Sequence, residues 1–203
     1  MEKKILISFQ IMSILVVFFC LYLLSMSSQT KSSTEEVGFY NFKEKAIDGS
    51  EVDFSRYKGK VCLVVNTACK CGLAKNGFAT IKKLQENFKD LQILLFPSAI
   101  STFIDQEKDS SEEIIEEIAK SGIVLKDENI VVFKKSVINS SVGIFNWLTS
   151  TYEKSGWFNI KSIKWNFTMF VVDKTGRRVD RHDPTCATYP NVEKSVNKFY
   201  SEL

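Results

Sequence analysis

Histidine is almost absent from this chain of 203 residues, which contains only His182. Zinc sites and cysteine–histidine nucleophile pairs both depend on histidine, so the sequence gives little room for either. Five cysteines are too few for a domain stapled by disulfides. The formal net charge of +3 is spread along the chain without a basic block, so nucleic-acid binding has little support.

One long uncharged hydrophobic run is present, and it lies near the start of the chain. Lys3 and Lys4 precede residues 5–24, which carry no charge. This run is long for a signal-peptide core and just long enough to span a bilayer. Residues 1–27 are therefore predicted to be either a cleaved signal peptide or an N-terminal membrane anchor. Because the positive flank should stay cytosolic, the rest of the chain is predicted to enter the secretory pathway, in the ER lumen, membrane-anchored or secreted.

Behind this run, the composition predicts a short linker and one domain. Residues 28–37 are polar and are interpreted as the linker. Residues 38–203 are enough for one domain of ordinary size with a real hydrophobic core.

Hydrophobic periodicity within the domain predicts strands and helices in alternation. Residues 60–66 predict a strand, because the continuous apolar run at 61–65 is typical of a strand covered on both faces of a sheet. Helical spacing over 76–88 predicts a helix, and residues 91–96 predict a second strand that ends at Pro97. The remaining predicted elements are a loop over 98–109, a helix from the capping box of Ser110 and Glu113 to Ala119, a short strand at 130–133, a helix over 142–152, a hairpin of 168–172 and 178–182, and a closing helix. This order describes an α/β, thioredoxin-like fold with a central mixed β-sheet flanked by helices.

Cys71 is the most informative residue because it lies between the first strand and the first helix. Unpaired N–H groups and the helix dipole favour a thiolate at such a position, so Cys71 is predicted to be a nucleophile. Cys69 is interpreted either as a small packed side chain or as a redox partner of Cys71 through a strained disulfide. Cys186 is another candidate resolving thiol, in a predicted loop.

Three ordered motifs resemble the signatures of the glutathione peroxidase family. Residues 65–73 read Val-Asn-Thr-Ala-Cys-Lys-Cys-Gly-Leu and are similar to the family's peroxidatic signature, although Cys69 stands where the family usually has serine. Residues 94–97, Leu-Leu-Phe-Pro, are similar to the second signature, and residues 164–168, Lys-Trp-Asn-Phe-Thr, to the third. The resemblance implies a thioredoxin-like fold and a peroxidase that acts on hydrogen peroxide or on organic and lipid hydroperoxides, with a role in the response to oxidative stress.

The resemblance also implies roles for individual residues. Cys71 would be the peroxidatic cysteine, oxidised to sulfenic acid, with Trp165 and Asn166 donating hydrogen bonds to its sulfur. This chemistry needs no metal and no bound cofactor. The catalytic Gln of the second signature is absent here, and Thr102 is the best positional substitute. The later pair Gln106-Glu107 matches a Gln-Glu pair of the family and is expected to reach the sulfur less readily.

The sequence also differs from part of the family in the residues that would reduce the oxidised Cys71. No cysteine lies near Lys120, where thioredoxin-using members carry a resolving cysteine. This implies that glutathione, or a thioredoxin-type or protein disulfide isomerase-type protein, reduces Cys71. The loop before Trp165 lacks the long insertion of tetrameric members, which implies a monomer that meets a membrane only through an uncleaved N-terminal segment. Two alternatives stay open: a disulfide relay through Cys69 and Cys71, and a weakly active or non-catalytic redox sensor.

Overall fold

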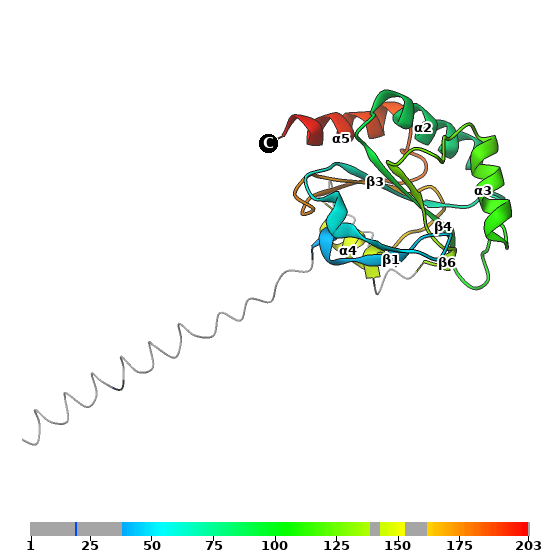
Figure 1. Cartoon of the computed structure of the whole chain (residues 1–203), viewed down its shortest axis with the longest axis horizontal. Helices are drawn as coiled ribbons and strands as arrows, with labels where there is room; N and C mark the ends of the chain where they lie inside the picture. The colour runs from blue at the N-terminus through cyan, green and yellow to red at the C-terminus, as the bar shows by residue number, and fades with distance from the viewer. Residues whose placement is uncertain (1–18, 20–37, 139–142, 153–161, 203) are drawn as a thin grey trace, which may run out of the picture. The chain divides into compact units, whose positions relative to one another are not determined.

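The structure is a computed structural model that describes residue 19 and residues 38–138, 143–152 and 162–202 (Figure 1). The predicted signal or anchor and the polar linker lie outside the described residues, except for Phe19, and they stay predictions. No helix among the described residues combines the length and the apolar character needed to cross a bilayer. From residue 38 on, the described residues belong to one unit, Val37–Leu203.

A mixed sheet forms the centre of this unit. Its strands are β3 (Cys62–Thr67), β4 (Gln92–Ala99), β5 (Ile130–Val132), β6 (Ser136–Val137), β7 (Met169–Val172) and β8 (Val179–His182). β3 pairs in parallel with β4 and antiparallel with β7, and the strand order is β5-β4-β3-β7-β8, with β6 paired to β4. The predicted mixed sheet is therefore confirmed, including the late hairpin of β7 and β8.

Helices and a small hairpin complete the unit. The helices are α2 (Ala74–Asn87), α3 (Ser111–Lys120), α4 (Gly143–Thr151) and α5 (Tyr189–Ser201). Before the sheet come η1 (Phe39–Asn41), the hairpin of β1 (Lys43–Lys45) and β2 (Glu51–Asp53), and η2 (Phe54–Tyr57). The predicted capping box of α3 is confirmed, because Ser110 Oγ accepts from Glu113 N at 3.2 Å and Ser110 N donates to Glu113 Oε2 at 3.4 Å.

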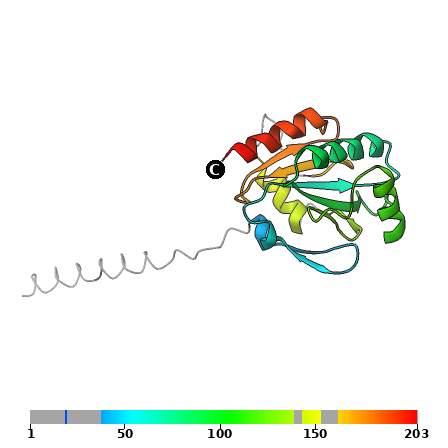
Figure 2. The same ribbon diagram turned by 45° about the horizontal axis from the view of Figure 1, so that its top comes forward.

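Side chains of β3 alternate between two buried faces of the sheet. Leu63 and Val65 join a core with residues of α2, α3 and α5, whereas Cys62 and Val64 join a second core with residues of α4. In Figure 1 and Figure 2, α2 and α5 lie on one side of the sheet and α4 lies on the other. Burial on both faces explains the unbroken apolar run in the sequence. Cys62 is fully buried, and this burial raises the pKa of its thiol.

The prediction that Pro97 ends the second strand is wrong, because β4 continues through it to Ala99. β5 pairs with β4 only as far as Leu95, and β6 begins to pair at Ser98. Pro97 lies between these two partner strands, where its missing N–H removes no hydrogen bond of the sheet. β6 itself has two exposed residues and no hydrophobic pattern, so the sequence did not indicate it.

The turn between β7 and β8 is organised by the buried carboxylate of Asp173. Asp173 accepts hydrogen bonds from the N–H groups of Arg177 and Arg178, at 3.0 and 3.1 Å. The Thr175 hydroxyl and Arg178 Nε donate to it as well, at 2.8 and 3.1 Å. Burial alone would raise the pKa of this carboxyl, but the hydrogen bonds outweigh burial and hold its pKa below the ordinary value.

We expect Asp173→Asn to weaken the acid sensitivity of the fold. Because the pKa of Asp173 is lower in the folded state than in the unfolded state, its contribution to stability is complete above about pH 4. That contribution is lost as the pH falls through the folded-state pKa. The free energy of unfolding, measured in urea at about pH 7 and about pH 3, should fall less in the variant than in the native chain. Equal losses in both proteins would contradict this role.

Candidate active site

Cys71 lies in the turn that joins β3 to α2. Its N–H donates to Ala68 O at 3.2 Å, and its carbonyl accepts from Ala74 N at 2.9 Å. The Leu73 N–H donates to Cys71 Sγ at 3.5 Å, and the cysteine is 6% exposed. A backbone donor at the start of α2 therefore points at the sulfur, where it would stabilise a thiolate.

The residues just before α3 brace this turn from the other side. Lys70 N donates to Gln106 O at 2.7 Å, and Cys69 N donates to Glu107 Oε1 at 2.9 Å. Glu107 is fully buried, and Lys108 N donates to the same oxygen at 2.8 Å. Burial first, and then the neighbouring Glu107 carboxylate, raise the pKa of the Cys69 thiol. Cys69 is therefore protonated at neutral pH.

Asn166 lies beside the same segment and is 1% exposed. Its Nδ2 donates to Gln106 Oε1 at 2.9 Å, while its Oδ1 is buried with no hydrogen-bond partner in the described part of the chain. Gln106 thus binds the turn before Cys71 through its backbone and Asn166 through its side chain. The structure therefore brings Asn166 and the cysteine turn together through Gln106.

Trp165 and Thr102 occupy more open positions. Trp165 is 39% exposed, and its carbonyl accepts from Asn66 Nδ2 at 3.3 Å. Thr102 is exposed in a tight loop closed by the bridge between Ser101 and Ile104. Within the described residues, neither side chain has a hydrogen bond to Cys71 Sγ. Gln106 connects the cysteine turn to Asn166. The sequence indicated it only through the Gln106-Glu107 pair, which was expected to reach the Cys71 sulfur less readily than Thr102.

Phe167 fixes the third motif against α2. Its backbone has a φ of 63°, in the left-handed region, and its N–H donates to Asn66 O at 2.7 Å. Its ring packs edge-to-face on Phe78, with centroids 5.1 Å apart. Gly77 gives the ring its space, because a Cβ there would lie 2.2 Å from the Phe167 ring. A glycine within a helix is therefore required for the packing next to Asn166.

A known family fits this arrangement. The sequence model described as glutathione peroxidase matches residues 39–149. The chain belongs to the glutathione peroxidase family. A probable phospholipid hydroperoxide glutathione peroxidase of Mesembryanthemum crystallinum is 37% identical over 177 residues, which cover 85% of this chain and 97% of that relative.

Solved structures of the glutathione peroxidase family share the fold. The chain matches "Crystal structure of T. cruzi GPX1" with a TM-score of 0.59 and 26% identity, covering 80% of this chain and 96% of that one. It matches "Crystal structure of Trgpx in apo form" with a TM-score of 0.59 and 26% identity, covering 82% and 97%. The predicted thioredoxin-like fold is thus confirmed, and the family is one of peroxidase oxidoreductases.

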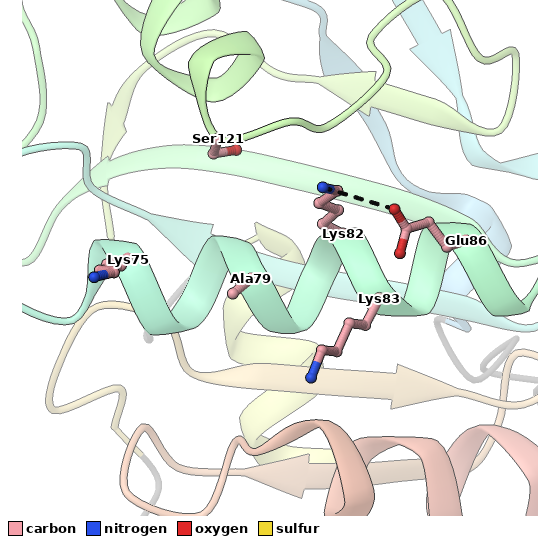
Figure 3. Close-up of a pocket in the computed structure, with 6 residues that line it drawn as sticks. All are labelled: Lys75, Ala79, Lys82, Lys83, Glu86 and Ser121. Atoms are coloured by element: carbon pink, nitrogen blue, oxygen red, sulfur yellow. Dashed lines mark ion pairs between the residues drawn. The ribbon is translucent and has the colours of Figure 1, made fainter.

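A pocket of about 410 Å³ lies on the outer face of α2 (Figure 3). Its lining residues are Lys75, Ala79, Lys82, Lys83, Glu86 and Ser121. Lys82 Nζ lies 3.8 Å from Glu86 Oε1, so one of its charges is already paired. No candidate catalytic residue lines this pocket. Across the described residues, no group of three or more His, Cys, Asp or Glu side chains could hold a metal ion.

Proposed function

We propose that the chain is a thiol-dependent peroxidase in which Cys71 reduces hydrogen peroxide or organic and lipid hydroperoxides. The observation that carries the proposal is the buried Cys71 sulfur at the start of α2, with the Leu73 N–H 3.5 Å away. Membership of the glutathione peroxidase family supports the reaction. The name of the Mesembryanthemum crystallinum relative, a probable phospholipid hydroperoxide glutathione peroxidase, supports hydroperoxides as the substrate class.

The reaction begins with attack of the Cys71 thiolate on one peroxide oxygen. The S–O bond forms as the O–O bond breaks, which leaves sulfenic acid on Cys71 and releases water or an alcohol after protonation. The Leu73 N–H favours the thiolate before attack. Asn166 Oδ1, buried and without a partner among the described residues, is available to accept a hydrogen bond from the hydroperoxide O–H. Trp165 and Asn166 remain the proposed donors to the developing negative charge.

The proposed reductant is glutathione or a protein thiol of the thioredoxin or protein disulfide isomerase type. An external thiol must finally return Cys71 to the reduced state, because sulfenic acid is two electrons more oxidised than a thiol. Lys120 stands at the end of α3, and no residue of that helix is a cysteine. The two electrons that return Cys71 to the thiol therefore come from a thiol outside the chain.

The second-order rate constant of the reduced full chain with hydrogen peroxide tests this proposal. We expect a rate at least about 100-fold above that of a free thiol, the gain that well-placed hydrogen-bond donors give. Mass spectrometry after one equivalent of peroxide should locate the oxidation on Cys71. A free-thiol rate would overturn the proposal in favour of a redox sensor that lacks peroxidase activity.

Gln106→Leu is expected to slow the reaction with peroxide about 10-fold to 100-fold. Leucine cannot accept the hydrogen bond from Asn166 Nδ2, so the amide loses the contact that positions it, and small displacements at a reacting centre have effects of this size. Thr102→Val is the matched comparison and should change the rate less than about twofold, because Thr102 is exposed. The same stopped-flow assay measures both variants. A larger loss in Thr102→Val would identify Thr102 as the replacement for the family's Gln.

A further inference from the structure

Two cysteines, Cys69 and Cys71, share the turn between β3 and α2. The hydrogen bond from Cys71 N to Ala68 O, 3.2 Å long, closes a four-residue turn in which Cys69 is the second residue and Cys71 the last. Two peptide units of bent chain keep their Cα atoms within about 7 Å, close to the span of a disulfide. Cys71 belongs to the core under the turn, and Cys69 packs against that same core.

Glu107 gives this turn a buried charge that the peroxide step does not use. Its Oε1 accepts the N–H groups of Cys69 and Lys108, at 2.9 and 2.8 Å. Its Oε2 is buried and has no hydrogen-bond partner in the described part of the chain. A buried carboxylate oxygen without a partner can accept a hydrogen bond from a nearby donor. The hydrogen bond from Cys69 N to Glu107 Oε1 places Cys69 next to this carboxylate.

We propose that Cys69 is the resolving thiol of this chain, and that Glu107 is the base that accepts its proton during disulfide formation with Cys71. The inference rests on the proposed peroxidase function, because it begins from sulfenic acid on Cys71. It goes beyond that function by assigning the second step of the cycle to a residue within the same turn.

The step balances within the site. Cys69 Sγ attacks the sulfur of the Cys71 sulfenic acid, and its proton passes to Glu107. The S–S bond forms as the S–O bond breaks, and the departing hydroxide takes the proton to leave as water. An external thiol, glutathione or a protein dithiol, then reduces the disulfide by two successive exchange steps. A ring closed over a single intervening residue is strained, which favours this reduction.

Before peroxide reacts, the protonated state of the Cys69 thiol is suited to a residue that reacts only after Cys71 has been oxidised. Burial and the adjacent carboxylate keep it protonated, so it does not compete with Cys71 for peroxide. When the sulfenic acid forms, the carboxylate is already in place to accept the proton. General-base assistance of this kind contributes a factor of about 10² to 10⁴.

The test treats the reduced full chain with one equivalent of hydrogen peroxide and then adds dimedone, which traps sulfenic acid, before mass spectrometry. In the native chain we expect a disulfide between Cys69 and Cys71 and little dimedone adduct. In Cys69→Ser we expect a persistent sulfenic acid on Cys71 that dimedone traps. Cys186→Ser is the control, since Cys186 is an exposed thiol, and it should behave as the native chain does.

Two results would overturn the inference while leaving the peroxidase function intact. One is as much dimedone adduct on Cys71 in the native chain as in Cys69→Ser. The other is a disulfide from Cys71 to Cys186. If Cys71 instead reacts with peroxide no faster than a free thiol, the proposed function fails and the inference fails with it.

Glu107→Gln tests the base separately, because the amide oxygen can still accept the N–H groups of Cys69 and Lys108. We expect the sulfenic acid on Cys71 to persist about 100-fold longer in this variant. Circular dichroism and Tm establish that the variant folds, and if it does not, Cys69→Ser still tests whether Cys69 is the resolving thiol. An unchanged lifetime in folded Glu107→Gln would remove Glu107 from the step.

Discussion

Cys71→Ser is expected to reduce the rate with hydrogen peroxide about 100-fold to 1000-fold, to that of an ordinary thiol. A serine hydroxyl does not ionise near neutral pH and cannot form a sulfenic acid. The other cysteines of the domain cannot replace Cys71. Cys62 is fully buried, and the pKa of the Cys69 thiol is raised, so the remaining reactivity should come from the exposed Cys186.

Competition kinetics against a peroxide-reactive reporter would measure this loss. Cys186→Ser provides the matched control, because it removes a thiol that the structure places in an exposed turn. That control should keep the fast rate of the native chain. A fast rate that survives in Cys71→Ser and disappears in Cys186→Ser would show that the peroxidatic residue had been assigned wrongly.

Gly77→Ala is expected to destabilise the fold by about 1–3 kcal/mol, in spite of its helical position. Alanine normally stabilises a helix relative to glycine, by about 1 kcal/mol. Here the added Cβ would lie 2.2–2.7 Å from three atoms of the Phe167 ring. The ring is buried and its backbone is held in the left-handed region, so it has little freedom to move away.

Urea denaturation of the native chain and the variant would measure this effect. Because Phe167 follows Asn166, a displaced ring should also reduce the rate with peroxide. Gly72→Ala is the comparison for stability, since nothing lies within 4 Å of a Cβ at Gly72. A gain in stability for Gly77→Ala would show that the ring adapts and that the close approach has no energetic importance.

Local sequence patterns predicted the parts of the fold that depend on burial of single elements. The apolar run in β3 indicated a strand covered on both faces, and Ser110 with Glu113 indicated the start of α3. The course of β4 through Pro97 was not predictable in this way. It depends on where β5 ends and β6 begins, which are contacts with segments more than thirty residues away.

The candidate site also has one part that the sequence could predict and one part that it could not. Cys71 could be found because an unbroken apolar run before it indicated a strand and helical periodicity after it indicated a helix. Gln106 could not be placed, because it follows a loop without periodicity whose path decides what its side chain meets. Glu107 carries no sign of burial in the sequence, since carboxylates are usually exposed. Only the tertiary structure brings it beside Cys69.

The burial of Cys62 in the middle of β3 makes this residue a natural reporter of sheet opening. With no exposed surface and a raised pKa, its thiol cannot react with an alkylating reagent in the folded state. Alkylation of Cys62 therefore requires the sheet to separate, and its rate at different reagent concentrations measures how often separation occurs. Cys62 is thus a built-in probe of transient opening of the sheet. Its alkylation can be followed in a cell extract as well as in a purified sample.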